Sequence, residues 1–166
     1  MPSTSSFDVT STIDFQEVDN ALNQARKEVG QRYDFKGATA DVDLNVADKK
    51  LTLTTSDEMK MNALWEILAT RLAKRGVAVK NFKMGDSESA AGGTVRRVIE
   101  IQQGIPIEAA KDIVKFLKDQ KLKKVQANIQ ADQVRVSSPS KDDLQDAMRA
   151  LRDHDFGVAL QFGNYR

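Results

Sequence analysis

The sequence predicts an α+β protein built from two ferredoxin-like α/β sandwiches in tandem, each with the element order βαββαβ. Two observations support this fold class. Apolar residues recur at helical spacing in four stretches, and they alternate with polar residues in eight short stretches, as in strands with one buried face. Along the chain, these stretches run through the order βαββαβ twice. The strands are expected near residues 6–13, 40–46, 50–56, 77–82, 94–103, 125–130, 132–137 and 158–163.

The first predicted helix begins at Asp14, which is followed three residues later by Glu17. This spacing is that of a capping box, in which the cap residue and the residue three positions later each accept a hydrogen bond from the other's backbone N–H. Its apolar face comprises Val18, Leu22, Ala25 and Val29. The second helix ends at Gly76, a residue type that often terminates helices. Its apolar face comprises Met61, Leu64, Leu68 and Leu72.

The third helix is expected to carry Pro106 in its first turn, and its apolar face comprises Ala110, Ile113, Val114 and Leu117. The fourth begins at the capping residue Ser140 with Asp143 three positions later, and its apolar face comprises Leu144, Ala147, Met148 and Leu151. Short crossovers within a βαββαβ unit place both helices on one face of a four-stranded antiparallel sheet. The other face is therefore open, and a binding site is expected there.

Residues 83–93, KMGDSESAAGG, are small, polar and rich in glycine, which is typical of a linker. We expect this segment to separate the two repeats, before the strand at 94–103.

Composition and charge limit the classes of function. The chain contains no cysteine, which excludes disulfides and thiolate metal sites and is typical of the reducing cytoplasm. No apolar run approaches the roughly 20 residues of a membrane span, and no secretion signal is evident, so we expect no membrane association. The net charge of +1 provides no overall field for a polyanion, so nucleic-acid binding would depend on local basic patches.

No catalytic motif is recognisable. The single histidine, His154, lies in a polar stretch after the fourth helix and supports neither a catalytic triad nor a metal site. Neither a P-loop nor a dinucleotide-binding glycine pattern occurs. The acidic pairs Asp41 with Asp43 and Asp142 with Asp143 fit an exposed strand face and a helix start. We therefore expect no enzymatic activity, no catalytic residue, no metal and no cofactor.

The first candidate binding surface is the open face of the second sheet. Alternation turns Gln126, Asn128 and Gln130 outward, and the neighbouring strand adds Arg135, while Lys124 closes a dense cationic segment beside them. Amides with one guanidinium can bond base edges and phosphates, although a solvated sheet face is an alternative. An Arg135→Ala variant should bind more weakly at an almost unchanged melting temperature, because the side chain points away from the helices.

The second candidate surface is RYDFKG at 32–37, between the first helix and the following strand. Arg32 and Lys36 can pair with a phosphate, and Asp34 can accept hydrogen bonds from a guanine edge. Phe35 is expected to fill the corner between helix and strand rather than to stack on a base.

Seven segments carry a family resemblance: SFDV at 6–9, RYDFKG at 32–37, RLAKRG at 71–76, QQGI at 102–105, KVQANIQADQVRV at 124–136, KDDLQ at 141–145 and QFGNYR at 161–166. Together they resemble the YajQ-like proteins, small bacterial proteins described as nucleotide-binding, over nearly the whole chain. One departure is Ala131-Asp132, where the family usually has Gly-Asp. Because a left-handed alanine costs about 1 kcal/mol or more, we expect a slightly different turn there.

The resemblance implies that the two domains exchange their first strands, so that residues 6–13 complete the second sheet and 94–103 the first. The domains would then comprise residues 15–103, and residues 1–14 with 104–166. The resemblance also implies a cytoplasmic, non-enzymatic protein that binds a nucleotide (GTP, ATP or cyclic di-GMP), transfer RNA, or both. We further expect a monomer that can pass a signal to a protein partner.

Two other classes of function are considered. A protein-interaction adaptor or regulator with only weak nucleotide affinity would agree with the near-neutral charge and with the absence of stacking aromatics on the sheet face. A small hydrolase of the acylphosphatase type would need an arginine-bearing glycine loop after the first strand. The residues there are STIDFQ, which argues against this class.

Overall fold

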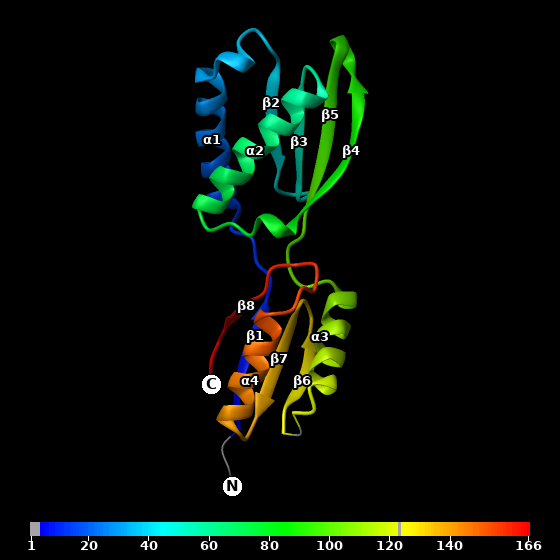
Figure 1. Cartoon of the computed structure of the whole chain (residues 1–166). Coiled ribbons are helices and arrows are strands. Elements are labelled where there is room, and N and C mark those ends of the chain that lie inside the picture. Colours follow the sequence, from blue (N-terminus) through cyan, green and yellow to red (C-terminus); the bar gives the residue numbers. More distant parts are fainter. Residues whose placement is uncertain (1–3, 123) are drawn as a thin grey trace. The chain divides into compact units, whose positions relative to one another are not determined.

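The computed structural model describes residues 4–122 and 124–166 of the chain. In these parts it contains four α-helices, three short 3-10 helices (η) and eight strands (Figure 1). In chain order they are β1 (Ser5–Thr10), α1 (Phe15–Gln31), η1 (Tyr33–Phe35), β2 (Ala40–Asn45), β3 (Lys50–Thr55), α2 (Glu58–Lys74), η2 (Val79–Asn81), β4 (Phe82–Ala90), η3 (Ala91–Gly93), β5 (Thr94–Ile101), α3 (Ile107–Asp119), β6 (Gln126–Gln130), β7 (Gln133–Ser138), α4 (Lys141–Arg152) and β8 (Gln161–Gly163).

The chain forms two compact units. The central unit is Ile13–Gln102, and the terminal unit consists of the residues up to Thr12 together with Gln103–Arg166. The sheet of the central unit has the order β2-β3-β5-β4, and that of the terminal unit has the order β6-β7-β1-β8. All neighbouring strands are antiparallel. The predicted α+β class with two ferredoxin-like units is confirmed.

The two units exchange a central strand. β1 precedes α1 in the chain, yet it pairs with β7 and β8 of the terminal unit. β5 precedes α3, yet it pairs with β3 and β4 of the central unit. This is the exchange that the family resemblance implied. It buries Phe7 and Val9 of β1 completely in the core of the terminal unit.

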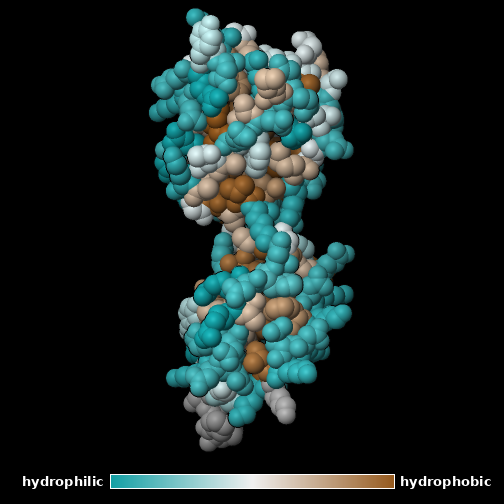
Figure 2. Space-filling view, viewed as in Figure 1, coloured by the Kyte–Doolittle hydropathy of each residue, from teal (hydrophilic) through white to brown (hydrophobic). Residues whose placement is uncertain are grey.

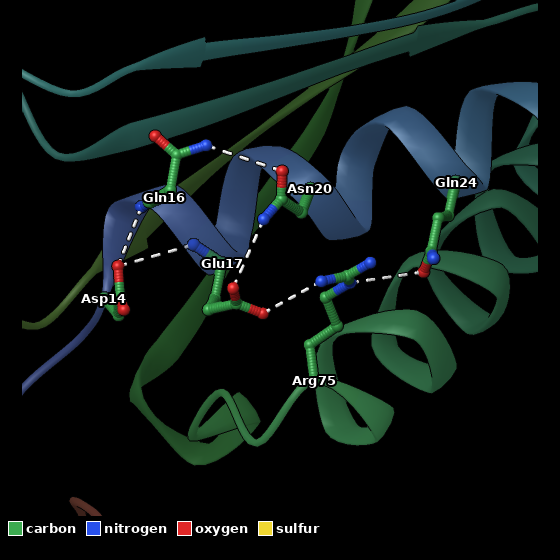
Figure 3. Close-up of polar contacts among 6 residues, drawn as sticks. All are labelled: Asp14, Gln16, Glu17, Asn20, Gln24 and Arg75. Atoms are coloured by element: carbon green, nitrogen blue, oxygen red, sulfur yellow. Dashed lines mark hydrogen bonds and ion pairs between the residues drawn. The ribbon is translucent and has the colours of Figure 1, made fainter.

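Side-chain caps define helix starts as predicted. Asp14 accepts hydrogen bonds from the backbone N–H groups of Gln16 and Glu17 (Figure 3), and Ser140 accepts one from Asp143 at 3.2 Å. Glu17 is not the reciprocal partner of the cap, because its carboxylate accepts hydrogen bonds from Asn20 and Arg75 instead. Pro106 lies just before α3 and not in its first turn.

Each unit buries its own hydrophobic core between its helices and one face of its sheet. In the central unit Leu22 and Leu68 share a core with Leu53 of β3. In the terminal unit Ile113 of α3 and Leu151 of α4 share a core with β1 and β7. Most of the surface visible in Figure 2 is hydrophilic, with hydrophobic residues in separate areas. One face of each sheet is therefore covered, as the sequence predicted.

The predicted linker at 83–93 is wrong. Residues Phe82–Ala90 form the edge strand β4, which pairs with β5 and has a bulge between Met84 and Ser87. Its polar side chains are exposed because an edge strand faces water. A Cβ on Gly85 would lie 2.5 Å from the carbonyl oxygen of Val98, so the close approach of the two strands requires glycine. The strand expected at 77–82 begins only at Phe82.

The turn between β6 and β7 also differs from expectation. Gln130 and Gln133 pair directly, which leaves a two-residue turn with Ala131 in the left-handed region at a φ of 55°. The alanine therefore adopts the conformation that the sequence argument judged unfavourable. The alternation that buries Val134 and Val136 determines the register, and a shift of one residue would expose both side chains. The free energy gained by burying both valines outweighs a strain of roughly 1–2 kcal/mol at Ala131.

Candidate functional site

The segment between α1 and β2 forms a tight corner. The Phe35 N–H donates to the carbonyl of Arg32, and the Lys36 N–H donates to that of Tyr33, so the backbone makes one 3-10 turn. Phe35 is buried in the core of the central unit, as predicted, and anchors the turn. Tyr33 is consequently turned away from the core and is 88% exposed. This presents an aromatic ring to solvent at a position held by backbone hydrogen bonds.

Arg32 and Asp34 form a bidentate pair at this corner. The guanidinium donates from Nε to Oδ1 at 2.9 Å and from Nη2 to Oδ2 at 2.8 Å. The hydrogen bond from Arg32 holds the pKa of Asp34 below its ordinary value, and the same bond raises the pKa of Arg32. The Arg32 Cζ also lies 5.8 Å from the centroid of the Phe35 ring. The pair is thus charged at neutral pH and fixed in orientation.

A cleft of about 580 Å³ lies at this corner, and we call it the corner cleft. Its lining residues are Arg26, Val29, Gly30, Gln31, Arg32, Tyr33, Phe35, Lys36, Gly37, Ala38 and Ala40. The volume lies within the range of small-molecule sites. Arg26 donates to the carbonyl of Val42 at 2.6 Å, whereas Lys36 is exposed and has no ion-pair partner among the described residues. The cleft therefore combines a mixed polar and apolar lining, an exposed aromatic ring and a cation that is available to an anion.

Two further hollows, of about 410 and 470 Å³, lie along α1 and α2. Their arginines already have carboxylate partners. Arg71 pairs with Glu28 at 3.0 Å, and Arg75 pairs with Glu17 at 3.2 Å while also donating to Gln24 (Figure 3). These contacts link the two helices. The arginines of these two hollows are therefore less available to a phosphate than Lys36, whereas the exposed Lys27 and Lys74 also line them.

On the terminal unit, the structure brings the sheet-face candidates together. Gln126, Asn128 and Gln130 are exposed on β6, Asn128 lies beside Arg135 of β7, and Lys124 is exposed just before β6. The amides thus share one face, as alternation predicted.

Arg135 itself is paired. Its Nε donates to Asp8 Oδ1 at 2.9 Å and its Nη2 to Oδ2 at 3.4 Å, while Asn164 donates to Oδ2 at 2.7 Å. Asp8 is only 6% exposed. The hydrogen bond from Arg135 holds the pKa of Asp8 below its ordinary value, assisted by that from Asn164 and opposed by burial. The positive charge of Arg135 is therefore already balanced by the Asp8 carboxylate. This weakens the case for Arg135 as a phosphate ligand.

Sequence reasoning missed Tyr33 as a candidate and Asp8 as the partner of Arg135. The segment RYDFKG contains two aromatics, and the 3-10 turn that buries Phe35 leaves Tyr33 exposed. Asp8 is 127 residues from Arg135, so no local pattern indicates the pair. Alternation between Phe7 and Val9 could at least have placed Asp8 on the open face.

The described residues 4–122 and 124–166 contain no group of three or more His, Cys, Asp or Glu side chains that could hold a metal ion. None of the helices described there is long and apolar enough to cross a membrane. The exposed His154 stacks on Phe116, with ring centroids 4.5 Å apart.

Comparison with known proteins identifies the family. A family model described as nucleotide-binding protein YajQ-like matches residues 5–166. The chain belongs to this family. Three bacterial relatives named nucleotide-binding protein illustrate the similarity to YajQ-like proteins. The relative from Elusimicrobium minutum is 48% identical, and the match covers 97% of this chain and 98% of the relative. The relative from Chloroherpeton thalassium is 46% identical over the full length of both chains. The relative from Solibacter usitatus is 49% identical, and the match covers 97% of this chain and 96% of the relative. The resemblance seen in the sequence is confirmed.

Proposed function

We propose that this protein binds nucleotides without catalysing a reaction, and that the corner cleft holds the ligand. The name shared by its relatives supports the class of ligand. The location is supported by the exposed ring of Tyr33 at a cleft that is also lined by Lys36, an exposed cation with no ion-pair partner in the described parts of the chain. One site thus contains an aromatic ring that can stack on the base and an ammonium group that can pair with the phosphate of the nucleotide.

Each side chain of the site has a distinct role. The base stacks on Tyr33, an interaction worth about 1–3 kcal/mol per base. Lys36 pairs with the phosphates. Asp34 uses two acceptor positions for Arg32 and has others left to accept from N1–H and N2–H of guanine. The site therefore prefers guanine nucleotides, such as GTP or cyclic di-GMP, to ATP.

Isothermal titration calorimetry with GTP, ATP, cyclic di-GMP and transfer RNA, at two salt concentrations, tests this proposal. Tyr33→Ala should weaken GTP binding by about tenfold or more, since it removes the stacking surface. Tyr165→Ala, which removes an exposed tyrosine of the terminal unit, is the matched control and should bind as the parent does. Lys36→Ala should weaken binding and reduce its salt dependence. Asp34→Asn should reduce the preference for guanine.

The same titrations examine the sheet face of the terminal unit, which we keep as the second candidate site with Lys124, Gln126, Asn128, Gln130 and Arg135. Unchanged affinity in Tyr33→Ala and Lys36→Ala, together with weaker binding in Gln126→Ala, would exclude the corner cleft and assign the ligand to the sheet face.

A further inference from the structure

The two sheets have four edge strands in the described parts of the chain, and three of them carry features that prevent pairing with another strand. β2 exposes Asp41 and Asp43, β4 has a bulge and three exposed charged residues, and β8 is only three residues long. Bulges, charges and short length are the usual means of blocking edge-to-edge association. β6 has none of them. Its sequence QANIQ contains no charge, proline or glycine, and all five residues pair regularly with β7.

Both faces of β6 are accessible. On the open face, Gln126, Asn128 and Gln130 are exposed. On the other face, Ile129 lies in register with the buried Val134, yet it is 36% exposed. The outer side of an edge strand in an antiparallel sheet also presents backbone N–H and C=O groups that have no neighbouring strand. β6 therefore offers an incomplete ladder and an incompletely covered apolar side chain.

We propose that β6 pairs antiparallel with β6 of a second copy of this chain, with the two-fold axis at Asn128. In this register Gln126 lies opposite Gln130, so amides face amides that can both donate and accept hydrogen bonds. Ala127 lies opposite Ile129, which covers the exposed isoleucine with a small neighbour. The contact is isologous and closes after two copies.

The charges that flank β6 support a second copy as the partner. Lys124 precedes the strand and Asp132 follows it, and both are exposed. In the antiparallel pair centred on Asn128, Lys124 of one copy and Asp132 of the other come to the same end of the ladder. The symmetry repeats this opposite-charge pair at the other end. A shift of two residues in register would separate both pairs.

One strand of five residues makes a small interface, so the association is weak, with a dissociation constant on the order of 100 µM. Sedimentation equilibrium of the full chain from about 10 µM to about 1 mM covers this range. The weight-average mass should rise from the monomer value of 18.4 kDa toward twice that value. A mass that stays at the monomer value throughout would overturn the proposal.

Charge reversal tests the register. Lys124→Glu and Asp132→Lys each place like charges together and should weaken association at least tenfold, whereas the double variant exchanges the charges and should restore it. A folding defect at either position would not be rescued in this way. Asn128→Lys places two lysines on the axis and should also give a monomer, whereas Asn62→Lys on α2 should associate as the parent does. Parent-like association of Asn128→Lys, or no recovery in the double variant, would exclude this interface.

Discussion

Asp8 shows how one residue changes the interpretation of its neighbours. Its carboxylate is buried on the sheet face that was expected to be open, and it accepts hydrogen bonds from Arg135 and Asn164. A buried carboxylate without such partners would be strongly destabilising. The structure therefore leads us to expect that Arg135 contributes to the stability of the terminal unit, whereas the sequence alone led to the expectation that its removal leaves the melting temperature almost unchanged.

We expect Arg135→Ala to lower the melting temperature by roughly 5 °C or more, because it leaves the Asp8 charge buried without its guanidinium. Arg149→Ala is the matched control, since Arg149 pairs with Asp146 on the exposed surface of α4 at 3.6 Å. Exposed pairs of this kind contribute little, so the control should melt as the parent does. Differential scanning calorimetry measures both, and equal melting temperatures for the two variants would contradict a structural role of Arg135.

The same pair predicts a pH dependence. The pKa of Asp8 is held below its ordinary value of 3.8 in the folded protein, chiefly by the hydrogen bond from Arg135. The pair therefore stabilises the fold above about pH 4, and this contribution is lost as the pH falls through the lower pKa of the folded state. Asp8→Asn lacks the contribution at every pH. Thermal unfolding should show a stability gap between parent and variant that narrows below pH 4, and a constant gap would refute this origin.

At the scale of elements, β4 shows that composition alone does not distinguish a linker from an edge strand. Its residues are small and polar because one side of the strand faces water, and Gly85 is present because the neighbouring backbone is close. The helices were predicted better than this strand. Their apolar faces repeat over several turns, whereas β4 contributes few apolar residues to the core.

Two glycine substitutions distinguish a glycine that is needed because a neighbouring strand is close, Gly85, from one that has free space around it, Gly30. Gly85→Ala should destabilise the protein by about 1–3 kcal/mol, because the new Cβ would meet the Val98 carbonyl at 2.5 Å. Gly30→Ala should stabilise it by about 0.5–1 kcal/mol, because Gly30 lies inside α1 with no atom within 4 Å of the added Cβ. Urea denaturation gives both free energies of unfolding. An unchanged or higher free energy of unfolding in Gly85→Ala would show that the close approach of the Val98 carbonyl does not limit the residue at this position.

At the scale of the whole molecule, the exchange of β1 means that only the terminal unit is assembled from two separate segments of the chain. The central unit is one continuous segment, Ile13–Gln102, and contains all four strands of its sheet. The terminal unit lacks a central strand without the residues before Thr12. Removal of β1 would expose the apolar surface that Phe7 and Val9 cover.

Fragments test this asymmetry. Residues 13–102 should fold alone, residues 103–166 should not, and a peptide of residues 4–12 added to the latter should restore its sheet. The reason is that β1 separates β7 from β8 and supplies ladder hydrogen bonds to both. Circular dichroism and NMR spectra of the fragments report folding. A folded 103–166 fragment without the peptide would show that β1 is dispensable.

From its sequence alone, this protein reveals its fold class, its four helices, the caps at Asp14 and Ser140, and the amides on one face of β6. These features depend on periodicity and on contacts within a few residues, which a single stretch of sequence contains. The sequence also carries the family likeness, because ordered matches extend along nearly the whole chain.

Only the tertiary structure decided that β4 is a strand, that Tyr33 faces solvent beside the buried Phe35, and that Arg135 is paired with Asp8. Each of these depends on a neighbour distant in the chain: β5 for β4, the core of the central unit for Phe35, and β1 for Arg135. Alternation tells which side of a strand is polar, but not which charge lies on the next strand. That information arises only when segments far apart in the sequence come into register.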